Sequence, residues 1–140
     1  MEVADLRPKL VSFRATSFHG ENKDASDPHR QWAFRLTQTI EVGLAVVANQ
    51  SATLQAIVKI DLEAKALMDG EPNQTADFSG KYEAKFVYPP DTKEVEVAPV
   101  FEQEPHQYIL ASQAFPLAMT HFRRELQAMG FDARQMPLGL

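Results

Sequence analysis

Cysteine is absent from this chain of 140 residues, so disulfide bonds and thiolate chemistry are both excluded. A long apolar run is absent as well, because no stretch approaches the roughly 20 residues that a membrane-spanning helix needs. The first residues, MEVADLRPKL, carry acidic side chains and lack the apolar core of a secretory signal. These absences predict a cytoplasmic protein that does not insert into a membrane.

Basic charge is scarce. The 14 Lys and Arg residues stand against 19 Asp and Glu residues, which gives a net charge of −5. Binding to a phosphate backbone requires a basic stripe that releases counterions, and the sequence contains none, so we expect no nucleic-acid partner. The hydrophobic share of 44% and the charged share of 24% are typical of an ordinary globular chain. The length predicts a single domain, residues 1–140.

The common signatures of enzymes and metal sites are also missing. The sequence has no Walker loop, no G-x-G-x-x-G and no G-x-S-x-G. Its four histidines are not spaced as metal ligands, since none lies four residues from another. They are His19, His29, His106 and His121. Asp61 and Glu63 share one strand face, but a lysine stands on either side of the pair, which indicates a neutralised, solvated face. We therefore expect no catalytic residue, no metal, no cofactor and no enzyme activity.

The clearest pattern that is present runs from Thr53 to Met68, TLQAIVKIDLEAKALM, and alternates with period two. Its apolar positions fall on one face: Leu54, Ala56, Val58, Ile60, Leu62, Ala64, Ala66 and Met68. Local propensity favours a helix for DLEAKALM, but a helix would scatter the charges around its whole circumference. The period therefore predicts a long antiparallel strand in a sheet with one apolar face.

Three further segments alternate in the same way and predict three more strands, at 10–19, 32–48 and 78–88. Turn-forming residues at 49–51 and 69–73 separate the later strands, and residues 20–29 form a longer loop. Consecutive strands with short turns at two of three junctions predict an antiparallel meander over 10–88, after a loose lead-in of residues 1–9.

The period changes after the sheet. Residues 89–105 predict an irregular, acidic crossover connection, and from 106 to 129 apolar residues recur at steps of three and four, which predicts a long helix. Gly130 is the expected stop, and Pro116 predicts a break or kink. The fold class is therefore α+β: a four-stranded antiparallel meander covered by a long C-terminal helix kinked near Pro116, with a C-terminal segment at 130–140.

The end of the chain carries Phe115-Pro116 in the helix, a polar stretch at 121–125, Gly130 after the helix, and Met-Pro-Leu at 136–138. In these features it resembles the bacterial export chaperone family SecB. The order of four strands, a crossover connection and a long helix is similar as well. The resemblance implies an ATP-independent chaperone, a holdase that keeps unfolded polypeptides in apolar grooves and, in protein export, delivers preproteins to the motor SecA.

In one respect the chain differs from the export proteins. Export SecB continues past the proline with a second helix and a mobile tail that contacts SecA, whereas this sequence stops at Leu140. The resemblance therefore leaves SecA open as a partner. Shorter SecB-like chaperones include proteins that protect an antitoxin in toxin–antitoxin systems, so the implied clients are unfolded preproteins or an antitoxin.

Surplus apolar surface predicts a homo-oligomer. One sheet and one helix can hardly bury Ile57 and Leu67 on the polar face of the sheet together with an apolar helix seam. The resemblance implies a homotetramer, with a dimer as the alternative. The interface residues predicted on the first strand and the helix seam are Phe13, Phe115, Met119, Phe122 and Leu126.

Aromatic residues around the connection predict where a client binds. We expect extended apolar segments to lie between the 89–105 connection and the sheet–helix body, because aromatic side chains give large contacts and accept varied sequences. The predicted client-binding residues are Tyr82, Phe86, Tyr88, Val97, Phe101 and Tyr108. The glutamates of the connection favour basic clients. Two other functions fit the same residues, namely a carrier of a small apolar ligand or lipid, and an adaptor subunit for one folded partner.

Overall fold

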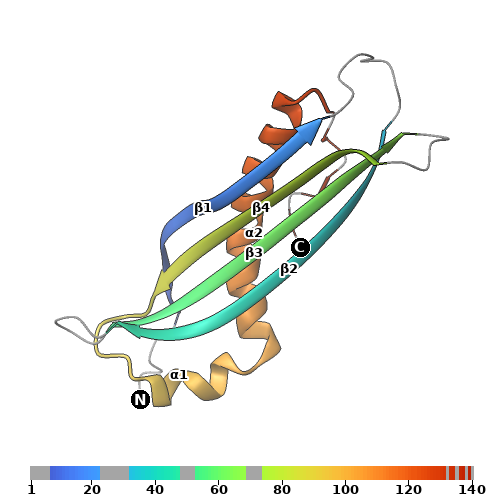
Figure 1. The fold of residues 1–140 in the computed structure, drawn as a ribbon. Helices are drawn as coiled ribbons and strands as arrows, with labels where there is room; N and C mark the ends of the chain where they lie inside the picture. Colours follow the sequence, from blue (N-terminus) through green and yellow to red (C-terminus); the bar gives the residue numbers. More distant parts are fainter. Residues whose placement is uncertain are drawn as a thin grey trace.

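The computed structural model describes residues 7–22, 32–47, 53–68, 74–131, 133, 134, 136, 137 and 139. The predicted turns at 49–51 and 69–73, His29 with most of its loop, and most of the lead-in lie outside these residues. The elements are β1 (Lys9–Asn22), β2 (Trp32–Val47), β3 (Thr53–Met68), β4 (Gln74–Val87), α1 (Glu94–Phe101) and α2 (Glu104–Ala128) (Figure 1). The four predicted strands and the long C-terminal helix are confirmed, and the fold class is α+β.

β3 spans the residues that the alternating pattern predicted. Its even-numbered side chains from Leu54 to Ala66 are buried, while Lys59, Glu63 and Lys65 on the other face are exposed. Hydrogen-bonded neighbours on both sides, β2 and β4, override the helical propensity of its second half.

The strand order is β1-β4-β3-β2, and all three pairs are antiparallel. β2, β3 and β4 form a meander, but β1 lies beside β4 and not beside β2 as predicted. Arg14 Nη2 of β1 donates a hydrogen bond to Glu83 Oε1 of β4 at 3.2 Å. The order is that of a Greek key. The prediction missed this position because a period-two pattern identifies the buried face of a strand and carries no information about its neighbour.

The two edges of the sheet differ in regularity. The register of β2 with β3 runs without a shift from the Trp32–Met68 pair to the Val47–Thr53 pair. The register of β1 with β4 shifts twice, on either side of Val11 and of Thr16. Such bulges interrupt the straight row of backbone groups that an additional strand needs for pairing. β2 therefore presents the smoother edge.

The connection after β4 is not irregular throughout, because it contains α1, whose Val97 and Phe101 are buried. α1 lies beyond the end of the sheet at which β4 ends, and α2 runs from there along one face of the sheet (Figure 1). α2 continues through Pro116 without interruption, so the proline does not end the helix. Gly130 follows the helix with a φ of 93°, the left-handed conformation expected of a glycine stop.

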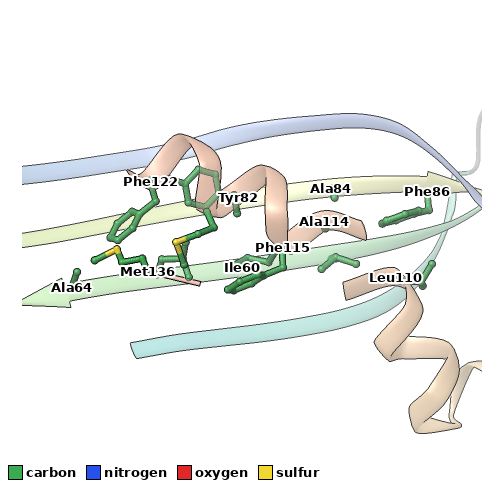
Figure 2. Packing of buried hydrophobic residues seen from close by; sticks show 14 of the residues in the cluster. Ile60, Ala64, Tyr82, Ala84, Phe86, Leu110, Ala114, Phe115, Phe122 and Met136 are labelled. Carbon is green, nitrogen blue, oxygen red and sulfur yellow. The ribbon is translucent and has the colours of Figure 1, made fainter. Parts of the chain in front are cut away.

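The helix seam and the apolar face of the sheet form the core. Figure 2 shows Leu110, Phe115 and Phe122 of α2 packed over Ile60 and Phe86 of the sheet. Small sheet residues lie in the same cluster: Ala56, Ala64, Ala66, Ala76 and Ala84. Burying one large apolar side chain stabilises a fold by about 1.5–3 kcal/mol, so this seam is the main attachment of α2.

The segment after α2 returns to the same core. Phe131, Ala133 and Met136 are buried, and the Phe131 ring meets that of Phe78 edge to face, with centroids 5.4 Å apart. Arg123 Nε donates a hydrogen bond to the Ala133 carbonyl at 2.9 Å, which ties the segment back to α2. Among its described residues, the predicted C-terminal segment is thus part of the core.

Candidate functional site

The structure separates the predicted client-binding residues into two groups. Five of them are buried in the core of the single chain: Tyr82, Phe86, Tyr88, Val97 and Phe101. Only Tyr108, at 54% exposure, offers a large part of its side chain to solvent. Val97 and Phe101 are buried because the connection forms α1, which turns its apolar residues inward, and Tyr82, Phe86 and Tyr88 are buried because they belong to the core between the sheet and α2. In this conformation these five buried residues, here called the aromatic row, are covered.

The contacts that hold α1 in place lie at the junction of α1 and α2. The His106 ring lies between two aromatic rings, stacked on Tyr88 with centroids 6.3 Å apart and edge to face with Phe101 at 5.8 Å. Tyr88 Oη and His106 Nε2 are hydrogen bonded at 2.9 Å. Gln107 Nε2 donates to the Phe101 carbonyl at 2.9 Å. The three aromatic groups therefore join the end of the sheet to both helices.

Burial changes the acid–base behaviour of this junction. It raises the pKa of Tyr88 to about 12, because the phenolate would lose its hydration. It lowers the pKa of His106, because the imidazolium would lose hydration too. Both groups are held in their neutral forms at neutral pH.

A second tyrosine–histidine pair lies further along the same strand and helix. Tyr82 Oη and His121 Nδ1 are 2.9 Å apart, and His121 Nε2 lies 3.5 Å from Glu125 Oε1. Burial, and secondly the charge of Glu125, raise the pKa of Tyr82 well above its usual range. Phe18 of β1 packs edge to face on His121, with centroids 6.0 Å apart. This second pair thus includes a carboxylate, which the junction pair lacks.

The sequence analysis did not select these histidines, because it considered their spacing only for a metal site. Their spacing carried a usable signal. His106 and His121 are fifteen residues apart, about four helical turns, and so lie on nearly the same side of α2. Tyr82 and Tyr88 are an even number of residues apart, and so lie on one face of the sheet.

Exposed apolar surface remains at the end of the sheet that carries the connection. Val46 of β2 is 50% exposed and Val95 of α1 is 76% exposed. A hollow of about 370 Å³, here called the connection hollow, lies between β2, β3 and the start of α1. It is lined by Val46, Leu54, Asp91, Thr92, Lys93 and Glu94. The hollow adjoins the smoother edge of the sheet.

The charge around the connection is mainly negative. Asp91 and the four glutamates of this region are exposed: Glu94, Glu96, Glu102 and Glu104. Lys93 is the one cation among residues 89–105, all of which the structure describes. An extended segment that approaches the connection hollow meets an acidic border.

The far face of the sheet is polar and internally neutralised, as predicted. Lys59 stands opposite Glu41 of β2 and Glu83 of β4, and Asp61 stands opposite Lys81. In the part of the chain that the structure describes, no cluster of three or more metal-binding side chains occurs. None of the helices described there is long and apolar enough to cross a membrane.

The predicted interface residues do not form a surface. Four of them are buried between α2 and the sheet, which leaves no surface for a second copy: Phe115, Met119, Phe122 and Leu126. Phe13 is partly buried and stacks on Tyr82, with centroids 5.9 Å apart. The apolar residues that α2 exposes are Tyr108, Ile109 and Leu117, and β1 exposes Leu10 and Val11. The helical period predicted the seam correctly, but it does not distinguish a seam within one chain from a seam between chains.

Comparison with known proteins identifies the fold. One solved structure similar to this chain is the Mycobacterium tuberculosis Rv1957 SecB-like chaperone, in complex with a ChAD peptide from the Rv1956 HigA1 antitoxin. The two share 16% sequence identity with a TM-score of 0.61, and the match covers 96% of this chain and 89% of the other. No protein-family model matches the sequence, and no curated protein does. The fold of this chain is SecB-like.

Proposed function

We propose that this SecB-like chain is an ATP-independent holdase, which binds unfolded polypeptides without catalysis or a cofactor. The observation that carries the proposal is the exposed apolar surface at the connection hollow: Val46 lines the hollow on β2, the smoother edge of the sheet, and Val95 follows the lining residue Glu94 in α1. An extended client there can pair its backbone with β2 and place apolar side chains against the valines. The acidic border favours clients with basic residues.

Two kinds of client fit this proposal, unfolded preproteins and an antitoxin. The antitoxin is supported by the similar solved structure, whose protein is in complex with an antitoxin peptide. Export of preproteins rests on the resemblance to SecB, and SecA stays an open partner. A cytoplasmic location follows from the same proposal.

We further propose that the protein is a homo-oligomer, a tetramer or a dimer. Its interface is expected on the surfaces that the structure leaves exposed, the outer side of α2 around Ile109 and Leu117 and the β1 residues Leu10 and Val11. The buried seam residues support this assembly only indirectly, by fixing which side of α2 faces outward.

The experiment is suppression of client aggregation without nucleotide. We expect the wild-type protein to keep a chemically unfolded client in solution, and a Val46→Ser, Val95→Ser variant to bind it about tenfold more weakly, because two exposed contacts are lost. Ile57→Ser is the control, since Ile57 is a partly exposed apolar residue on the other face of the sheet, away from the connection hollow. Equal loss in both variants would assign the effect to general surface polarity and remove the connection hollow from the proposal.

The two alternative functions give different results. A carrier of a small apolar ligand needs space between sheet and helix, and that space is filled by buried side chains such as Phe115 and Ile60 (Figure 2). The structure therefore does not favour a carrier. An adaptor for one folded partner is distinguished by competition, because unrelated unfolded proteins displace one another from a holdase and do not displace a folded partner from an adaptor.

A further inference from the structure

We propose that His106 is a pH-sensitive latch that keeps α1 docked at the end of the sheet and against the start of α2, and that its protonation releases α1 and enlarges the apolar surface open to a client. The inference rests on the proposed function only for its second half, the effect on clients. Its first half concerns the junction alone.

The geometry places His106 where three elements meet. Its ring is enclosed by Tyr88 at the end of the sheet and Phe101 at the end of α1, and its Nε2 is hydrogen bonded to Tyr88 Oη at 2.9 Å. His106 itself belongs to the first turn of α2. Loosening this ring therefore loosens the contact between α1 and the sheet at one point.

Among the described residues, the groups that face His106 are uncharged, and the loss of hydration on burial outweighs the attraction of a cation to their rings. The sheet contributes the neutral phenol of Tyr88, and α1 contributes the apolar ring of Phe101. Within the described residues His106 forms no ion pair, and its neighbours Glu102 and Glu104 are exposed. The first turn of a helix also disfavours a positive charge, because the macrodipole is positive there. A proton on His106 is therefore less stable in the closed junction than in water.

The pKa of His106, which burial lowers, gives the sign of the effect. Well above about pH 6.5 the imidazole is neutral whether the junction is closed or open, and the latch holds. As the pH falls below that value, the open form takes up the proton first, so the closed form loses stability. The second pair differs in geometry, because Glu125 Oε1 lies 3.5 Å from His121 Nε2, whereas no carboxylate is paired with His106 among the described residues. Acid should release the α1 end of α2 and leave the other end attached.

The surface that the release of α1 exposes is apolar. Release of α1 uncovers Val97, Phe101 and Tyr88, which are buried in the closed form. These are members of the aromatic row that the sequence predicted as the client-binding surface, so the closed structure and that prediction describe two states of one site. A peptide that binds this row binds the open form better and shifts the junction toward it.

The first measurement uses amide hydrogen exchange, corrected for the intrinsic pH dependence, at about pH 7.5 and about pH 5. In the wild type we expect protection of residues 94–107 to fall severalfold at the lower pH while β3 stays protected. In His106→Gln, whose amide nitrogen can still bond to Tyr88 Oη and does not titrate, protection should not change with pH. His121→Gln is the matched control and should behave as the wild type.

Unchanged protection in the wild type, or an equal fall in His106→Gln, overturns the latch. If His106→Gln does not fold, proton NMR titration of the wild-type imidazole decides. A His106 pKa at or above the ordinary value of 6.5 contradicts the proposal, and a lower one supports it.

The second measurement concerns the client. The probe is a fluorescent, unstructured peptide of Leu, Phe, Ser and Lys residues, whose charge does not change between the two pH values. We expect its dissociation constant to fall severalfold at the lower pH for the wild type and to stay level for His106→Gln. If the dissociation constant is the same at both pH values while the protection of residues 94–107 changes, the coupling between the latch and client binding is overturned. If the peptide binds at neither pH, the result counts against the holdase proposal but not against the latch.

Discussion

Single residues set how closely the helix and the sheet approach. Gly80 is buried beneath the ring of Tyr82, and a Cβ added there would lie 2.7 Å from Tyr82 Oη and 2.9 Å from a ring carbon. That ring is held by its hydrogen bond to His121 and by its stack on Phe13. Glycine at position 80 is therefore what lets the tyrosine lie flat on its own strand and reach α2.

Gly80→Ala should lower the free energy of unfolding by about 1–3 kcal/mol, because the ring must leave its place. Chemical denaturation measures the change. Gly43→Ala is the matched control, since a Cβ at that position meets nothing within 4 Å and the strand should keep or slightly gain stability. Equal stability of the two variants would show that the Tyr82 ring moves without cost.

The buried tyrosines predict a loss of stability in alkali. The pKa of Tyr88 is about 12 in the folded chain and 10.0 in its ordinary state. Between these values the unfolded chain has released more protons than the folded chain, so stability falls as the pH rises from about 10. Tyr88→Phe should flatten this fall, measured as the urea midpoint between about pH 9 and pH 11. A fall of the same steepness in the variant would assign the effect to other groups.

At the scale of the elements, α2 is notable for the proline that it accommodates. Pro116 lacks the amide hydrogen that would bond to the Ser112 carbonyl one turn earlier. Hydroxyl groups on either side bond within the helix, Ser112 Oγ to the Ile109 carbonyl at 2.8 Å and Thr120 Oγ1 to the Pro116 carbonyl at 2.7 Å. The buried seam on both sides of the proline keeps the helix continuous.

Pro116→Ala should raise the free energy of unfolding by about 1–3 kcal/mol, because it restores a backbone hydrogen bond in the helix interior. Thermal and chemical unfolding both measure this gain. Ser112→Ala is the control, since it removes only a hydroxyl bond on the exposed side. A loss of stability in Pro116→Ala would mean that packing of the proline ring outweighs the missing hydrogen bond.

The strands and the long helix were the features most easily predicted from the sequence. The alternation of apolar and polar residues predicted both ends of β3 correctly, and the recurrence of apolar residues every three or four positions predicted the buried seam of α2. Both predictions succeeded because an element that is buried on one face has apolar residues at a regular spacing. α1 escaped prediction, since Pro99 lies inside it and its eight residues carry only two buried positions, Val97 and Phe101. The candidate site was harder still. Aromatic residues that line a core and those that line a groove have the same periodicity, so the sequence does not show that α2 covers Tyr82 and Phe86 or that α1 turns Phe101 inward.

At the scale of the whole molecule, the exposed side of α2 decides the assembly. Leu117→Glu places a charge on that side, where the leucine is 40% exposed, and should reduce an oligomer toward single chains with little loss of stability. Leu126→Ala is the contrasting variant: it should cost about 2–5 kcal/mol of stability through a cavity in the seam while leaving the outer side intact.

Light scattering with denaturation on the same samples separates these outcomes. A wild-type mass equal to one chain, unchanged at tens of micromolar, would rule out the proposed oligomer. An unchanged mass in Leu117→Glu, with an oligomeric wild type, would move the interface to another surface.

The pairing of β1 with β4 has a consequence for the folding of the chain during its synthesis. β1 is made first, yet its partner β4 begins at residue 74. At a synthesis rate of about 5–20 residues per second, β1 leaves the ribosome several seconds before that partner exists. β2, β3 and β4 can join through local contacts meanwhile, so β1 should dock last, and Phe13→Ala should speed unfolding far more than it slows folding. During this delay the nascent chain displays an unpaired strand with Phe13 and Phe18, and under the proposed function it is itself a client for copies that have already folded.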